Sequence, residues 1–242
     1  MDLNEELINR DYSKLPRKYW ASQNLCWYLH DVMMSIFREV IDEDLMKTKI
    51  KFKNNEEANE FQSYDCIYDW LIEKKRDDEF SKILCKDLSM RLIGDFLNYI
   101  YEVLSNLERG KITIACDLLR KPFKDNLFYL EWILYNDKEI SNYIYNGKID
   151  KYALEKINYN YKKKIVLNSL EKNNFINQFN NIELNKTIFD IRYNYNNSAS
   201  LQLVWNKATH LVTTFNKIRT KDLNFIYKDR KSTRLNSSHH PD

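Results

Sequence analysis

The sequence predicts an all-α protein, an irregular bundle of several helices in which only residues 223–227 have the pattern of a short strand. Two observations favour this fold class. Apolar side chains recur every three or four residues over long stretches, which is the period of an α-helix. Glycine and proline, which disfavour helix interiors, number only 3 each among 242 residues. We therefore expect a single helical domain over residues 1–228.

The N-terminal half predicts three helices. The first spans about 16–45, because Pro16 suits the first turn of a helix and apolar residues repeat from there at helical spacing. A second helix is expected over 55–76. A third helix is expected over 77–110. It begins with three acidic residues, 77–79, and ends at Gly110, since a glycine in the left-handed conformation commonly stops a helix.

The C-terminal half predicts further helices over 111–135, 137–145, 150–172, 183–195 and 200–215. Pro122 lies inside the first of these and removes the hydrogen bond to the carbonyl of Leu118, so we expect a kink or a break there. Gly94, inside the long third helix, has two explanations. It either allows two helices to approach closely or is a tolerated glycine that costs about 1 kcal/mol.

The end of the chain predicts a non-native tail. Residues 229–239 are identical, residue for residue, to one reading frame of a sequencing-library adapter. Such segments are set aside before a fold is inferred. We therefore expect the natural sequence to be truncated at about residue 228 and 229–242 to be foreign to it. His30 and His210 are then the native histidines.

Composition bears on compartment and partners. The net charge of +3 is nearly balanced and does not support nucleic acid as a partner. No apolar run approaches the roughly 20 residues of a membrane span, and the acidic start is not a signal peptide. The 4 cysteines are widely spaced and suit reduced thiols, so we expect a cytoplasmic protein. Abundant Lys, Asn, Ile and Tyr are typical of an AT-rich bacterial genome.

Familiar catalytic motifs are missing from the sequence. It contains no G-x-G-x-x-G and no G-x-x-x-x-G-K-[ST], which bind dinucleotides and nucleoside triphosphates. H-E-x-x-H, which binds zinc, and the G-x-S-x-G turn of hydrolases are missing as well. We therefore expect no cofactor and no metal.

One candidate site surrounds Pro122. Asp117 and Arg120 are three residues apart and would share a helix face, with Lys124 following. A buried arginine held by a carboxylate beside a broken helix can bind a phosphate with two parallel hydrogen bonds. The alternative is an ordinary ion pair within the helix, worth a few tenths of a kcal/mol.

A second candidate is a polar stripe on the helix expected over 200–215. Asn206, His210, Thr213 and Thr214 would share one face, with Lys207 beside them. A neutral His210 can act as a general base, with Asn206 fixing its tautomer. The alternative is a hydrogen-bonded polar ridge between packed helices.

The other native histidine, His30, predicts no site. His30 and Asp31 are adjacent in a helix. Adjacent helix positions do not face each other, so we expect no dyad there.

The helix from Cys116 to Phe123 and the histidine-bearing helix from Trp205 to His210 resemble all-helical bacterial proteins of the HEPN and abortive-infection type. The resemblance implies a helical fold and a role in regulation or defence. HEPN ribonucleases carry an arginine and, a few residues later, a histidine on the same helix. Arg192 and His210 are too far apart for that pattern, so the resemblance favours the fold over ribonuclease activity.

Two functions follow from these observations. The first is an interaction module without catalysis, regulatory or defence-related, whose partner is another protein or a second copy of the chain. The alternative is a helical enzyme acting on RNA or a phosphorylated small molecule. Its catalytic residues would be His210 and Arg120, and its substrate-binding residues Asn206, Lys207 and Asp117. Convergence of Arg120 and His210 on one cleft would favour the enzyme.

Overall fold

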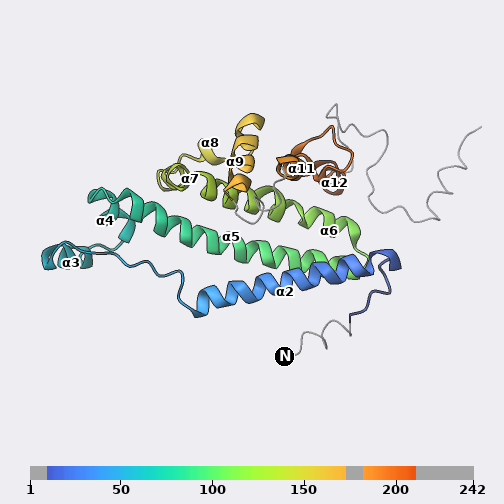
Figure 1. The fold of residues 1–242 in the computed structure, drawn as a ribbon, viewed down its shortest axis with the longest axis horizontal. Coiled ribbons are helices and arrows are strands. Elements are labelled where there is room, and N and C mark those ends of the chain that lie inside the picture. The colour runs from blue at the N-terminus through green and yellow to red at the C-terminus, as the bar shows by residue number, and fades with distance from the viewer. Residues whose placement is uncertain (1–9, 173–181, 211–242) are drawn as a thin grey trace, which may run out of the picture. The chain divides into compact units, whose positions relative to one another are not determined.

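The computed structural model describes residues 10–172 and 182–210 (Figure 1). All regular elements in that part of the chain are helical, which confirms the predicted all-α class. The expected strand at 223–227 lies outside the described residues. No helix in the described part combines the length and apolar character that crossing a membrane requires.

Contacts divide the chain into two compact units, each built from separate segments. The first unit comprises Met1–Val32, Leu97–Lys124 and Lys186–Asp242, and the second comprises Met33–Phe96 and Asp125–Asn185. Two long helices, α2 (Trp20–Asp42) and α5 (Asp77–Glu108), run through both units, close to their predicted bounds. The single domain expected over residues 1–228 stays a prediction.

In the first unit, one face of α2 is buried against α5. Gln23 Nε2 donates to the carbonyl of Leu104 at 3.0 Å, and Trp27 Nε1 donates to Glu108 Oε1 at 2.5 Å. The Trp27 ring also meets Tyr101 edge-on, with centroids 5.4 Å apart. These side chains recur at the helical period, so this face of α2 is fixed on α5. The short 3-10 helix η1 (Arg17–Tyr19) precedes α2.

In the second unit, the structure supports the first of the two explanations for Gly94, a close approach of two helices. A Cβ atom at Gly94 would lie 3.3 Å from Cζ of Phe37. The missing side chain therefore leaves room for the Phe37 ring of α2 against α5. Gly110, just after α5, has φ of +71° and confirms the predicted left-handed stop.

The single helix expected over 55–76 is wrong, because the chain forms α3 (Asn55–Gln62) and α4 (Ile67–Glu73) instead. Phe61 and Trp70 are nine residues apart and would lie on opposite sides of one continuous helix. The turn between α3 and α4 brings their rings together, with centroids 5.0 Å apart. Leu71 and Phe80 complete the buried cluster that this pair joins.

The break predicted at Pro122 is confirmed. Helix α6 (Ile112–Leu118) ends before it, and a π-helical turn, η2 (Lys121–Asn126), contains the buried proline. Helix α7 (Leu127–Tyr145) follows. The boundary expected near residue 136 is a kink within α7, where Asn136 has non-helical angles (φ −156°, ψ 85°).

The helix expected over 150–172 is also wrong, since α8 (Ile149–Tyr152) and α9 (Tyr159–Glu171) are separate. Asn158 begins α9 by accepting a hydrogen bond from the backbone N–H of Tyr161 at 2.8 Å. At the other end, Lys172 Nζ donates to the carbonyls of Leu134 and Tyr135 at 2.9 and 2.8 Å. Lys172 thereby satisfies carbonyls next to the α7 kink and ties α9 to α7.

The last two described helices are α11 (Ile182–Tyr193) and α12 (Leu201–Thr209). The first agrees closely with the helix predicted over 183–195. Ser200 begins α12 as expected, its hydroxyl accepting from the backbone N–H of Gln202 at 3.3 Å. However, α12 is shorter than the helix predicted over 200–215.

Candidate functional site

Two segments that carry predicted site residues lie side by side in the first unit. Helices α6 and α12 pack together there, and Thr209 Oγ1 donates to Asp117 Oδ1 at 2.7 Å. Arg120 follows Asp117 by three residues, and His210 is the residue after Thr209. The structure therefore brings two of the predicted segments together, although 92 residues separate the bonded pair.

The predicted polar stripe is wrong as a helical face. Helix α12 ends at Thr209, and His210 has an extended backbone (φ −121°, ψ 124°), so it no longer continues the face of Asn206. Asn206 Nδ2 donates to the carbonyl of Gln202 at 2.7 Å, within its own helix. Thr213 and Thr214 lie outside the described residues.

The ion pair predicted between Asp117 and Arg120 is also wrong. Helix α6 ends at Leu118, between the two residues, and Asp117 bonds to Thr209 instead. No ion pair joins them in the part of the chain that the structure describes. The side chains of Arg120, Lys207 and His210 are exposed, so the buried guanidinium expected for phosphate binding is not Arg120.

The buried guanidinium belongs to Arg192 in α11, which the sequence did not single out for binding. Its Nε donates to the carbonyl of Phe123 at 3.1 Å, and its Nη2 donates to the hydroxyl of Tyr193 at 2.8 Å. Phe123 follows Pro122 in the π-helical turn, where regular helical hydrogen bonding is interrupted. Arg192 therefore holds an irregular backbone segment in place.

The expectation that His30 and Asp31 do not meet is wrong as well. His30 Nδ1 lies 3.1 Å from Asp31 Oδ1, because the short aspartate side chain bends toward its neighbour. The imidazole is buried, standing edge-on to Trp27 and tilted against Tyr101. This packing makes His30 part of the first unit's core, whereas Asp31 is partly exposed.

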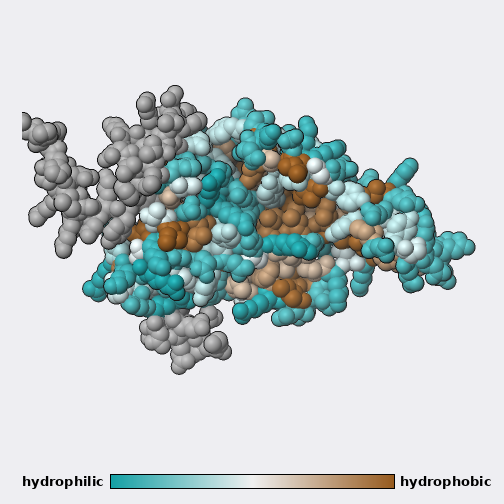
Figure 2. Space-filling model, turned by 180° about the vertical axis from the view of Figure 1, so that it is seen from behind, coloured by the Kyte–Doolittle hydropathy of each residue, from teal (hydrophilic) through white to brown (hydrophobic). Residues whose placement is uncertain are grey.

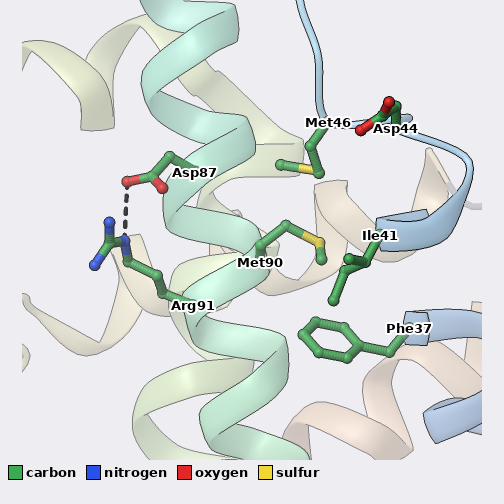
Figure 3. Close-up of a pocket in the computed structure, with 7 residues that line it drawn as sticks. All are labelled: Phe37, Ile41, Asp44, Met46, Asp87, Met90 and Arg91. Atoms are coloured by element: carbon green, nitrogen blue, oxygen red, sulfur yellow. Dashed lines mark hydrogen bonds and ion pairs between the residues drawn. The ribbon is translucent and has the colours of Figure 1, made fainter. Parts of the chain in front are cut away.

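An apolar groove in the second unit was not predicted (Figure 3). It is open to solvent, has a volume of about 480 Å³, and is walled by Phe37 and Ile41 of α2, Met46 beyond its end, and Met90 of α5. In Figure 3, Met90 points toward Ile41 and Phe37, with Met46 above them. Because these side chains come from two stretches of chain that are far apart in the sequence, 37–46 and 87–91, no local sequence pattern could reveal the groove.

Charged side chains surround the apolar wall of the groove. Arg91 Nε is paired with Asp87 Oδ2 at 2.9 Å, as Figure 3 shows. Asp44 is paired with Lys47 at 2.5 Å. The rim is therefore polar and internally paired, whereas the wall is built from aliphatic, thioether and aromatic groups.

The described residues contain no group of three His, Cys, Asp or Glu side chains that could hold a metal ion.

Comparisons with protein-family models, curated proteins and solved structures find nothing that matches this chain.

Proposed function

We propose that this protein is a regulatory interaction module, and that the groove of the second unit binds an apolar segment of a partner protein. The observation that carries the proposal is the groove itself. Four apolar side chains, two of them methionines, reach the surface side by side. Methionine is unbranched and polarisable, so it adapts to different partner side chains.

The openness of the groove favours a protein segment over a small molecule. Small-molecule sites typically bury 70–90% or more of their ligand. Here Ile41 is half exposed, and the wall faces outward along α2 and α5. An amphipathic helix that places its apolar face on the wall would cover it, as helices do in hydrophobic grooves.

The rim disfavours nucleic acid as the occupant. Among the residues that line the groove, all of them described, Arg91 is the sole cation, and Asp87 neutralises it. Binding of a phosphate backbone depends on lysine and arginine, and the residues that line the groove offer only this paired arginine. The net charge of +3 agrees with this preference.

We further propose that the protein works in the cytoplasm. All four cysteines are free thiols, and Cys85 is buried. Burial raises the pKa of the Cys85 thiol to about 12, which keeps it protonated and unreactive at neutral pH. Unpaired cysteines suit a reducing compartment.

Site-specific photocrosslinking in the cells that express the protein tests the groove. A photoreactive residue replaces Ile41 in the groove or, as the control, Ile149, an exposed isoleucine of the same unit outside it. We expect a discrete adduct with one protein from position 41 and none from position 149. Equal adducts from both positions, or none from either, would contradict the proposal.

A second candidate function rests on the contact between α6 and α12. The hydrogen bond from Thr209 to Asp117 joins the segments that carry His210 and Arg120. In an enzyme acting on RNA or a phosphorylated small molecule, His210 would move a proton and Arg120 would bind the phosphate.

Assays with RNA and with phosphomonoesters separate the two functions. The enzyme predicts turnover that His210→Ala and Arg120→Ala each abolish, while Asn206→Ala, Lys207→Ala and Asp117→Ala raise KM. The interaction module predicts no turnover in the wild-type protein. Turnover that survives both catalytic replacements would come from a contaminant.

A further inference from the structure

The outer face of α2 is apolar and exposed. Its inner face, with Gln23, Trp27 and His30, is buried in the first unit. Leu25, Leu29 and Val32 lie two positions further along and so point about 200° away from those residues. Figure 2 shows hydrophobic residues reaching the surface among hydrophilic ones on one side of the molecule.

The exposed side chains form a regular row. Leu25, Leu29 and Val32 follow one another at spacings of four and three, Tyr28 flanks them, and the spacing continues along the helix to Ile36. We call Leu25, Tyr28, Leu29 and Val32 the α2 stripe. Alternating spacings of three and four are those by which helices pack side by side in coiled coils. A helix that is apolar on opposite faces is normally covered on both.

We propose that the α2 stripe is a self-association surface, covered by the α2 stripe of a second copy of this chain. None of its residues lines the groove, so the inference is independent of the function proposed above. It commits to a second copy as the occupant for two reasons, one of charge and one of area.

Charge favours a second copy. The chain as a whole is 30% charged, yet Asp31 is the only residue from Trp20 to Val32 with a full charge, and it lies against His30. The positions beside the stripe, such as Ala21 and Cys26, are neutral. A two-fold interface places the same patch on both sides, so a charged flank would repel its own copy. Helices that pair with a different protein usually carry charged residues at the positions flanking the apolar row, and these select the partner. The positions that flank the α2 stripe lack such charges.

The available area suits a weak dimer. The four stripe residues are between 37% and 57% exposed. At roughly 200 Å² for a fully exposed large side chain, they offer roughly 400 Å² per copy, or roughly 800 Å² for a pair. That is the size of weak, transient protein interfaces, which bury less than about 1,200 Å². We therefore expect a reversible dimer rather than an obligate one.

Sedimentation equilibrium on the full chain tests the inference between roughly 1 and 500 µM, where interfaces of this size dissociate. The wild-type mass should rise with concentration from 29.4 kDa toward twice that value. Leu29→Asp should weaken the dimer at least tenfold. Ile114→Asp is the matched control, because Ile114 is another aliphatic residue of the same unit with the same 50% exposure, outside the stripe. Circular dichroism should show that both variants stay helical.

A second measurement uses the exposed thiol of Cys26, which flanks the α2 stripe. A flexible bismaleimide should link two copies through Cys26, with a yield that grows with concentration and falls in Leu29→Asp. A mass of 29.4 kDa at every concentration would overturn the inference. Equal dissociation by Ile114→Asp and Leu29→Asp would overturn it too, since the dimer would then not use the stripe.

Discussion

The carboxylate of Glu139 receives three aromatic donors in the second unit, and its loss should destabilise the fold measurably. Trp132 Nε1 donates to it at 2.9 Å, the hydroxyl of Tyr161 at 2.5 Å, and that of Tyr143 at 3.3 Å. Trp132 and Tyr143 belong to α7, whereas Tyr161 belongs to α9. The Asn136 kink lies between Trp132 and Glu139, so this network holds the kinked helix and its neighbour together.

Glu139→Ala should lower the free energy of unfolding by about 3 kcal/mol. Trp132 is fully buried, so its N–H would lose its partner without access to water, which costs about 1–3 kcal/mol. The two tyrosine hydroxyls are less buried and can turn toward water, so each loses only about 0.5 kcal/mol. Glu139→Gln keeps one oxygen acceptor and should cost about 1 kcal/mol.

Urea unfolding followed by tryptophan fluorescence measures these changes, and amide exchange in α9 shows where the loss occurs. Glu43→Ala is the control, because Glu43 is exposed and its side chain makes no hydrogen bond within the described residues. We expect faster exchange in α9 for Glu139→Ala. A loss below about 0.5 kcal/mol, equal to the control, would refute the reasoning.

Three further predictions concern stability. In thermal unfolding, Gly110→Ala should lower the stability more than Gly147→Ala does. Both glycines have a positive φ, which costs an alanine roughly 1 kcal/mol or more, but only at Gly110 would the new Cβ also lie 3.3 Å from Lys14 Cβ. Equal losses of stability in the two variants would contradict an effect of this contact. Burial raises the pKa of the Tyr129 hydroxyl to about 12 in the folded protein. As the pH rises from 10 to 12, the hydroxyl ionises in the unfolded chain before it does in the folded one, so the free energy of unfolding should fall over this range. Tyr129→Phe should flatten that fall in urea titrations, and an unchanged profile would count against it. Arg192→Met should cost about 2 kcal/mol in urea unfolding, because the half-buried carbonyl of Phe123 loses a charged donor. A neutral effect would show that the guanidinium is dispensable.

Much of the fold follows from local signals. The long apolar periodicity predicted α2 and α5 almost to their ends, and Pro122 marked the interruption after α6. The break between α3 and α4 had no such marker, because neither glycine nor proline occurs in residues 62–67. That break depends on tertiary packing, since only a turn lets Phe61 reach Trp70.

The candidate sites were harder to predict. The type and spacing of residues singled out Asp117 and His210. The polar stripe that was to include His210 required a helix continuing past residue 210, but α12 ends at Thr209. The contact between Asp117 and Thr209 joins residues 92 positions apart, which no periodicity encodes. The groove combines two distant stretches of chain, and its methionines are ordinary apolar residues in the sequence.

The affinity between this protein and the partner captured at position 41 tests the central claim most directly. Calorimetry with both purified proteins should show binding by the wild type and at least tenfold weaker binding by Ile41→Asp, because a carboxylate on the apolar wall would be desolvated without a partner. Ile149→Asp, at an isoleucine that is also more than half exposed but lies outside the groove, should bind as the wild type does. Unchanged affinity for Ile41→Asp would contradict the assignment of the groove as the binding surface.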